Sequence, residues 1–186
     1  MKNSTKTALL RALVVAGLVL AITSPSQGFE GFLRMDGFKG ESADPRYRDW
    51  IAVTAVSWGH QMPVATRGDG GSGATIRTQF QPLTVSKNLD STSPGLAQIV
   101  VIGRVIRQVV LDLVQGPGQP PFARLELQDA VITSYTVEGA AGSPQRPVEK
   151  LSIMFGKISW GAFPTQPDGR PGELKHGWDV RTNQGF

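Results

Sequence analysis

Short β-branched or aromatic runs along the chain are separated by segments rich in Gly and Pro, and some of these runs alternate apolar with polar residues. In the segment that begins at Phe122, for example, Arg124 and Glu126 alternate with Leu125 and Leu127. As a strand, this segment has one polar face towards solvent and one apolar face towards the core. With 22 Gly, 13 Pro and few helical periodicities, the sequence predicts an all-β fold. Strands are predicted at residues 30–35, 50–58, 76–87, 105–113, 122–137 and 148–160.

Two of these predicted strands change face part-way along. Pro82 lies between Phe80 and Leu83, which belong to opposite faces, and proline cannot donate a ladder hydrogen bond, so we expect a bulge or an edge position there. Gly156 lies at a similar change in the last strand and predicts a second bulge or a corner. Residues 115–121 are rich in Gly and Pro and predict a hairpin turn between the fourth and fifth strands.

A single short helix is predicted after the third strand. Ser93 is suited to cap it, Pro94 suits the first helical position, and Gly103 suits a left-handed end. Leu96 and Ile99, with Val100 next to it, would face the sheet. At about nine residues the helix is too short to be stable alone and must pack on the rest of the protein.

A charged segment, Phe38 to Asp49, separates the first two strands. Because a segment this charged is costly to bury, we expect it to project from the fold as a loop, and a loop longer than a hairpin needs is often functional. A solvated surface loop without a role is the alternative. Its charged residues are Lys39, Glu41, Asp44, Arg46, Arg48 and Asp49.

The first 28 residues have the pattern of a secretory signal peptide. Lys2, Lys6 and Arg11 precede an apolar run, residues 12–22, which is too short for a membrane span of about 20 residues. We predict cleavage before Phe29, with a retained membrane anchor as the alternative. The domain would then be residues 29–186, with no membrane contact after the leader is removed.

Loss of the leader changes the charge balance. The chain has 19 Lys and Arg against 15 Asp and Glu; the leader holds three of the bases and none of the acids, which leaves 16 against 15. The basic character therefore gives no support for a nucleic-acid partner, and no cluster of basic and aromatic residues suggests one.

Residues able to carry catalysis are few. The chain has no cysteine, which excludes disulfides and thiolate chemistry, and its two histidines, His60 and His176, are expected to be incidental. The loop acids Glu41, Asp44 and Asp49, with Asp36 before them, could supply a carboxylate pair or a calcium loop, but the EF-hand spacing is not met. We therefore expect no catalytic residues, no metal, no cofactor and no enzymatic activity.

Five sequence blocks, in this order, resemble the Hcp family, the tube proteins of type VI secretion. The resemblance runs from about residue 32 to residue 183, which is nearly all of the chain after the leader. They are Asp36-Gly37-x-x-Gly40-Glu41-Ser42 with Asp49-Trp50-Ile51 and Ser57-Trp58-Gly59; Val85-Ser86-Lys87-x-x-Asp90-x-x-Ser93-Pro94-x-Leu96; residues 125–135; Phe155-Gly-Lys-Ile-Ser-Trp160; and Gly177-Trp178-Asp179 with Asn183.

The resemblance implies a β-barrel of two sheets with one short flanking helix. It also implies six-fold rings that stack into a hollow tube, with a contractile sheath and spike as partners and small effector proteins in the lumen. The charged loop would form the contact between stacked rings. The last block implies that the C-terminus is packed on the domain. The Gly and Pro content from residue 161 onward would by itself suggest a disordered tail instead.

The leader departs from the family, whose members assemble in the cytoplasm. Either the true start lies further along the chain and the protein is cytoplasmic before secretion, or the protein is exported. An exported copy could not join a cytoplasmic sheath, so the alternative function is a periplasmic or secreted binding module on the same barrel. A secreted hydrolase on this scaffold is a third and weaker alternative.

Overall fold

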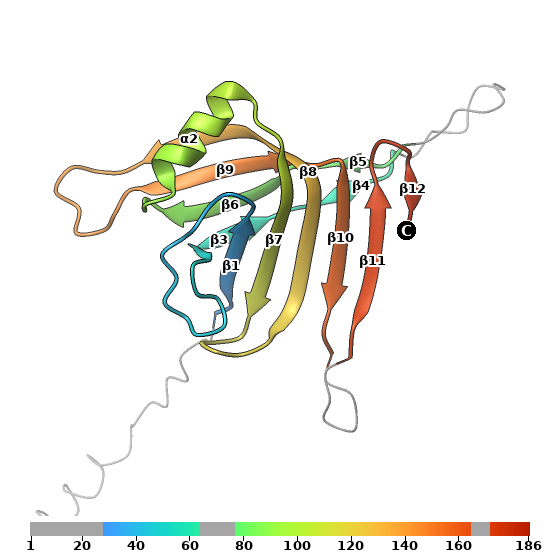
Figure 1. Cartoon of the computed structure of the whole chain (residues 1–186), viewed down its shortest axis with the longest axis horizontal. Helices are drawn as coiled ribbons and strands as arrows, with labels where there is room; N and C mark the ends of the chain where they lie inside the picture. The colour runs from blue at the N-terminus through green and yellow to red at the C-terminus, as the bar shows by residue number, and fades with distance from the viewer. Residues whose placement is uncertain (1–27, 64–76, 165–171) are drawn as a thin grey trace, which may run out of the picture.

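The computed structural model of the protein describes residues 28–63, 77–164 and 172–186 (Figure 1). The predicted signal peptide and most of the segment between the second and third predicted strands lie outside these residues. Within them, no helix is both long and apolar enough to cross a lipid bilayer. The predicted all-β fold with one short helix is confirmed.

The first sheet is built on the hairpin of β7 and β8 and contains antiparallel pairs throughout. β1 and then β2 extend it on one side, and β10, β11 and β12 extend it on the other. The strands are β1 (Glu30–Met35), β2 (Ile51–Val53), β7 (Ile106–Val114), β8 (Pro121–Glu138), β10 (Lys157–Ala162), β11 (Leu174–Asp179) and β12 (Gln184–Gly185).

The second sheet shares β8 with the first. The first part of this 18-residue strand pairs with β7 and β10, and from Val131 onward it pairs with β9. On the other side of the barrel, β2 pairs with β1 while β3 pairs with β6, and Thr54 between them donates its N–H to Ser86 O at 2.7 Å. The remaining strands are β3 (Ala55–Ser57), β6 (Leu83–Asn88), β9 (Val148–Met154) and the separate ribbon of β4 (His60–Gln61) and β5 (Gln79–Phe80).

Three predicted strands are interrupted where the sequence changes character. Residues 50–58 bend at Thr54 and give β2 and β3. The strand predicted at 76–87 is broken before Leu83, so that Pro82 lies between β5 and β6, as its missing N–H suggests. The corner predicted at Gly156 is confirmed, since β9 and β10 on its two sides belong to different sheets. The predicted packed terminus is confirmed by β11 and β12.

The helix α2 (Ser93–Ile102) packs on the barrel through Leu96 and Ile99, which are buried (Figure 1). Gly103 ends it at φ 62°, a left-handed conformation that glycine adopts without strain. The predicted cap was wrong: Thr92 is the capping residue, and Ser93 is already helical. The Ser93 hydroxyl instead accepts the N–H of Asp90 at 2.9 Å and lies 3.3 Å from Lys87 Nζ.

A buried ion pair lies between the second sheet and the start of α2. Lys87 and Glu149 are directly opposite on β6 and β9, both side chains are fully buried, and Lys87 Nζ is 2.6 Å from Glu149 Oε2. Asp90 is 2.8 Å from the same ammonium, and the Tyr135 hydroxyl donates to Glu149 Oε1 at 2.7 Å. Each buried charge is therefore met by a partner, which is the condition for burying it at all.

Replacing Lys87 by Met should lower the free energy of unfolding by about 3–5 kcal/mol, because two carboxylates would lose their cation. Urea unfolding measures this loss, and Lys150→Met, an exposed position next to Glu149, is the matched control. The double variant Lys87→Met/Glu149→Leu should lose less than Lys87→Met alone, because it no longer leaves Glu149 buried without its cation. A larger loss in the double variant would contradict this account.

Candidate functional site

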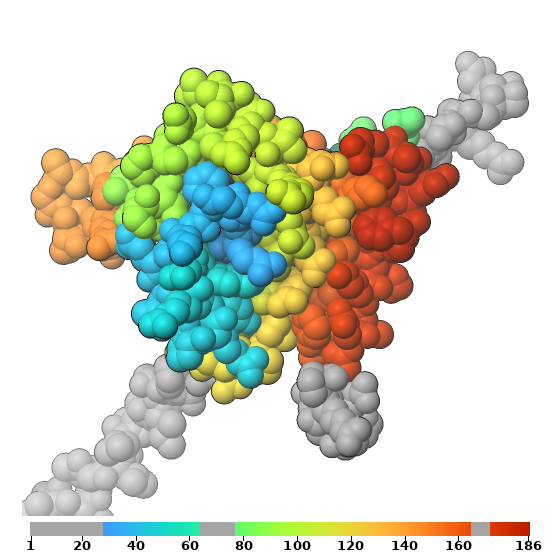
Figure 2. All heavy atoms as spheres, in the orientation of Figure 1, coloured from blue at the N-terminus to red at the C-terminus, as the bar shows by residue number. Residues whose placement is uncertain are grey.

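The charged loop between β1 and β2 does not project from the fold, contrary to the prediction. It lies flat against the barrel beside β1, where the blue-to-cyan surface of Figure 2 is continuous with its surroundings. Tyr47, in the middle of the loop, is only 3% exposed, and its ring stacks on Phe32 with centroids 4.3 Å apart. Trp50 packs edge-on against Tyr47 at 5.1 Å. One aromatic side chain among the charges thus attaches the loop to the sheet.

Beneath Tyr47 lies a charged pair that bridges β7 and β8. Asp112 and Arg124 are opposite each other, and the guanidinium binds the carboxylate through two bonds, Nε–Oδ1 at 2.6 Å and Nη2–Oδ2 at 2.7 Å. Burial, and then the negative charge of Asp112, raise the pKa of Tyr47 above its ordinary value. The tyrosine therefore stays protonated as a donor facing this carboxylate.

Two of the loop acids hold the loop to distant segments. The Asp44 carboxylate accepts the N–H groups of Arg46 and Tyr47 at 2.8 and 3.2 Å, and that of Gly118 in the β7–β8 turn at 2.8 Å. Burial works against its charge, but these three donors hold the pKa of Asp44 below its ordinary value. Asp44 therefore acts as an internal tether of the loop.

Glu41 has a similar part at the other end of the loop. Its Oε1 accepts the N–H of Ser91 at 2.9 Å, which lowers the pKa of Glu41, and its Oε2 lies 3.5 Å from Arg146 Nη1. Gly40 beside it is needed for space, because a Cβ there would overlap the carbonyl of Trp50. The backbone N–H of Gly40 donates to Asp49 O at 2.8 Å.

The six predicted loop residues therefore divide into two groups. Glu41 and Asp44 bind within the protomer. The other four are exposed on the outer surface of the anchored loop: Lys39, Arg46, Arg48 and Asp49. Asp49 has a positive φ of 63°, a conformation that aspartate tolerates better than most residues.

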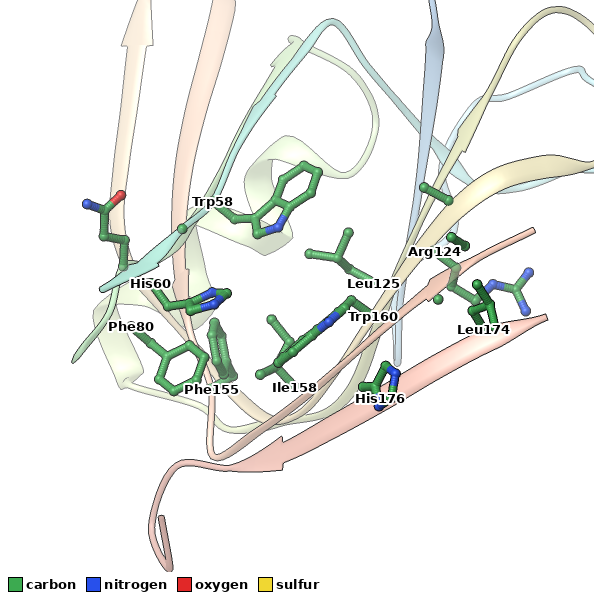
Figure 3. A pocket seen from close by; sticks show the side chains of 15 residues that line it. Trp58, His60, Phe80, Arg124, Leu125, Phe155, Ile158, Trp160, Leu174 and His176 are labelled. Carbon is green, nitrogen blue, oxygen red and sulfur yellow. The ribbon is translucent and has the colours of Figure 1, made fainter. Parts of the chain in front are cut away.

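A second feature, absent from the sequence-based predictions, is an apolar pocket of about 370 Å³ between the β4–β5 ribbon and the β8–β10–β11 face (Figure 3). We call it the aromatic pocket. The ring of His60 lies 5.7 Å from that of Trp160 and 5.5 Å from that of Phe80. The ring side chains that line the pocket are Trp58, His60, Phe80, Phe155, Trp160 and His176.

Both histidines of the chain line this pocket. We expected each to be incidental and did not predict that they share one site. They are more than 100 residues apart in sequence, and only the pairing of β10 with β11 opposes His176 to Trp160. No local motif carries that information. The one sequence signal is that Trp lies two residues from each histidine, in Trp58-Gly-His60 and His176-Gly-Trp178.

The acids that the sequence suggested for catalysis or calcium binding make separate contacts within the protein and do not form one cluster. Glu41 and Asp44 accept backbone N–H groups, and Asp36 lies 3.9 Å from Arg107. Within the three described stretches, no group of three or more His, Asp or Glu side chains is arranged to hold a metal ion.

Residues 32–161, more than half of the chain, match the family described as type VI secretion system effector, Hcp. The chain belongs to the Hcp family. Solved Hcp structures share the fold over almost their whole length. A structure of a type six secretion system protein is 25% identical with a TM-score of 0.76, over 86% of this chain and 100% of that one.

Two further structures show the same fold at lower identity. Hcp1 from Salmonella typhimurium is 19% identical with a TM-score of 0.68, covering 85% of this chain and 99% of its own. A type VI secretion system effector from Yersinia pestis is 21% identical with a TM-score of 0.63, covering 81% and 99%. No curated protein sequence matches the chain. The chain is therefore a type VI secretion Hcp protein, and its family is one of secreted tube proteins and not a known enzyme family.

The two tyrosines of this Hcp protein allow a direct test of the buried contacts. Burial and the bond to Glu149 raise the pKa of Tyr135 to about 12, and the pKa of Tyr47 is raised as well. Folding raises both pKa values, so their stabilisation is complete below the ordinary value of 10.0 and is lost as the pH rises towards 12.

Absorbance of the folded protein should therefore show almost no tyrosinate at pH 10, where the urea-unfolded chain is half ionised. Tyr135→Phe should remove one of the two late titrations and leave the other. An early titration of either tyrosine in the folded protein would show that its hydroxyl is not held as described.

Proposed function

We propose that this Hcp protein is a tube subunit that assembles into six-fold rings, and that the rings stack through the outer surface of the charged loop. Membership of the Hcp family supports the assembly. The observation that supports the role of the loop is its anchoring. A segment that carries five exposed charged residues is nonetheless fixed by a buried tyrosine and by two carboxylates that accept hydrogen bonds from other parts of the protomer.

Anchoring matters because a contact repeated along a tube must present the same geometry in every subunit. A loop that is ordered before association loses little conformational entropy on binding. Its exposed charged residues, three basic (Lys39, Arg46 and Arg48) and two acidic (Glu41 and Asp49), are suited to setting the register and the rate of association more than the affinity itself. The carboxylates of Glu41 and Asp44 already accept hydrogen bonds within the protomer, which leaves the three basic side chains and Asp49 to make the contact.

The partners of this assembly would be further copies of the chain, small effector proteins carried in the ring lumen, and the spike and sheath of the secretion machine. These partners follow from the family. The described residues carry no feature that would select one effector over another.

Reversing two exposed charges tests the stacking contact. In Arg46→Glu/Arg48→Glu, stacks should form only at a concentration about tenfold higher or more, because like charges placed together across an interface are costly. Electron microscopy of stacked rings measures the effect, and urea unfolding should show wild-type stability, since both side chains are exposed.

The matched control is Arg77→Glu/Lys150→Glu, which makes the same change of charge at two exposed positions outside the loop. It should stack like the wild type. If Arg46→Glu/Arg48→Glu also stacks like the wild type, the loop is not the stacking surface.

The leader-like pattern of residues 1–28 favours a second candidate, an exported binding module that does not join a contractile sheath. The two candidates differ in the mature N-terminus and in mass. Under the tube proposal, purified protein should form rings by light scattering and negative-stain microscopy. A monomer whose N-terminal sequence begins at Phe29 would favour the exported module.

A further inference from the structure

The outer side of α2 is unusually apolar for a helix on a protein surface. Surface helices normally have one apolar stripe and a polar opposite face. Here the helix, SPGLAQIVVI, has no charged residue at all. Val101 is 86% exposed, Ile102 63%, and Val105 just beyond the helix 56%. We call these three side chains the aliphatic ridge.

The aromatic pocket is a concave apolar surface elsewhere on the protomer. Leu174 at its margin is 62% exposed and Trp58 is 40% exposed, so the pocket has apolar surface that its own protomer leaves uncovered. The pocket arises because β10 and β11 continue the first sheet beyond β8, while β9 turns away into the second sheet. Among the described residues, His60 and Phe80 of the β4–β5 ribbon, with Trp58 before it, line the pocket on the side opposite this extension (Figure 3).

One protomer cannot place its own ridge in its own pocket. Figure 1 shows α2 and the β4–β5 ribbon at different sides of the barrel. Two matching apolar surfaces on different faces of one chain are what a head-to-tail contact between identical copies requires.

We infer that the aliphatic ridge of one protomer inserts into the aromatic pocket of the next copy of this chain. The inference rests on the proposed ring, for which it names the contact between neighbouring subunits. Apolar side chains that fill a pocket lined by aromatic rings are typical of the residues that dominate binding energy at interfaces.

The charges beside the two surfaces are also complementary. Arg104 and Arg107 flank the ridge, and the Arg107 side chain is 90% exposed with only a 3.9 Å contact to Asp36. The exposed Glu173 is next to Leu174 at the margin of the pocket, and Lys175 on the other side of Leu174 is already paired with Glu126 at 2.8 Å. This arrangement favours a second copy of the chain as the occupant of the pocket.

Two variants of the full chain separate the two halves of the contact. Val101→Asp/Ile102→Asp disables the ridge, and Leu174→Glu disables the pocket. All three positions are exposed, so both variants should fold with wild-type stability. Each alone should associate about a hundredfold more weakly than the wild type in sedimentation velocity. Phe29→Glu, another exposed apolar position, is the control and should assemble normally.

A mixture of the two variants gives the decisive result. The ridge variant keeps an intact pocket and the pocket variant keeps an intact ridge, so together they can form one contact and no more. The mixture should therefore contain a one-to-one dimer, with no larger species. The absence of this dimer, or wild-type assembly by either variant alone, would overturn the inference.

These results are distinguishable from failure of the proposed function. If the wild type forms rings and both variants form them equally well, the ring exists but uses another contact. If the wild type remains a monomer at high concentration, both the ring and this contact are wrong.

Discussion

The buried ammonium of Lys87 is the constraint on which much of this structure depends. It requires Glu149 on the neighbouring strand and Asp90 before the helix to lie within bonding distance, and Glu149 in turn receives the hydroxyl of Tyr135 on β8. These contacts fix β6, β8, β9 and the start of α2 relative to one another. A purely apolar core at this place would tolerate small slips, whereas a buried ion pair with few partners does not.

The charged loop depends on a second polar contact of the same kind. Asp112 is completely buried on the sheet, and it is compensated by Arg124 from the opposite strand and by the nearby Tyr47. The position of the loop's outer surface therefore depends on how β7 pairs with β8. A subunit that repeats many times along an assembly benefits from this arrangement, because the position of its contact surface is determined by strand pairing and not by the loop alone.

Much of the fold was predictable from local pattern. The strands, the helix and the corner at Gly156 followed from alternation, from the spacing of Leu96 and Ile99, and from the position of glycine and proline. The errors concern three sets of side chains. Tyr47 lies among charged residues and yet is buried against Phe32. Ser93 bonds to Asp90 and Lys87 instead of capping the helix. His60 and His176 line the same pocket although they lie on strands that do not pair with each other. Sequence pattern reports local preference, and such contacts are decided by tertiary packing.

The short outer strands of the first sheet have a consequence for solubility. An edge strand presents unpaired N–H and C=O groups that can recruit strands from other molecules. Here β12 pairs with only Trp178 and Asp179 of β11, and at the other edge β2 pairs with only Gly31 to Leu33 of β1. Among the described residues, no strand pairs with Leu174 to His176 on the outer side of β11. Copies of this chain held at high local concentration would therefore meet only short stretches of open strand edge at the two ends of this sheet.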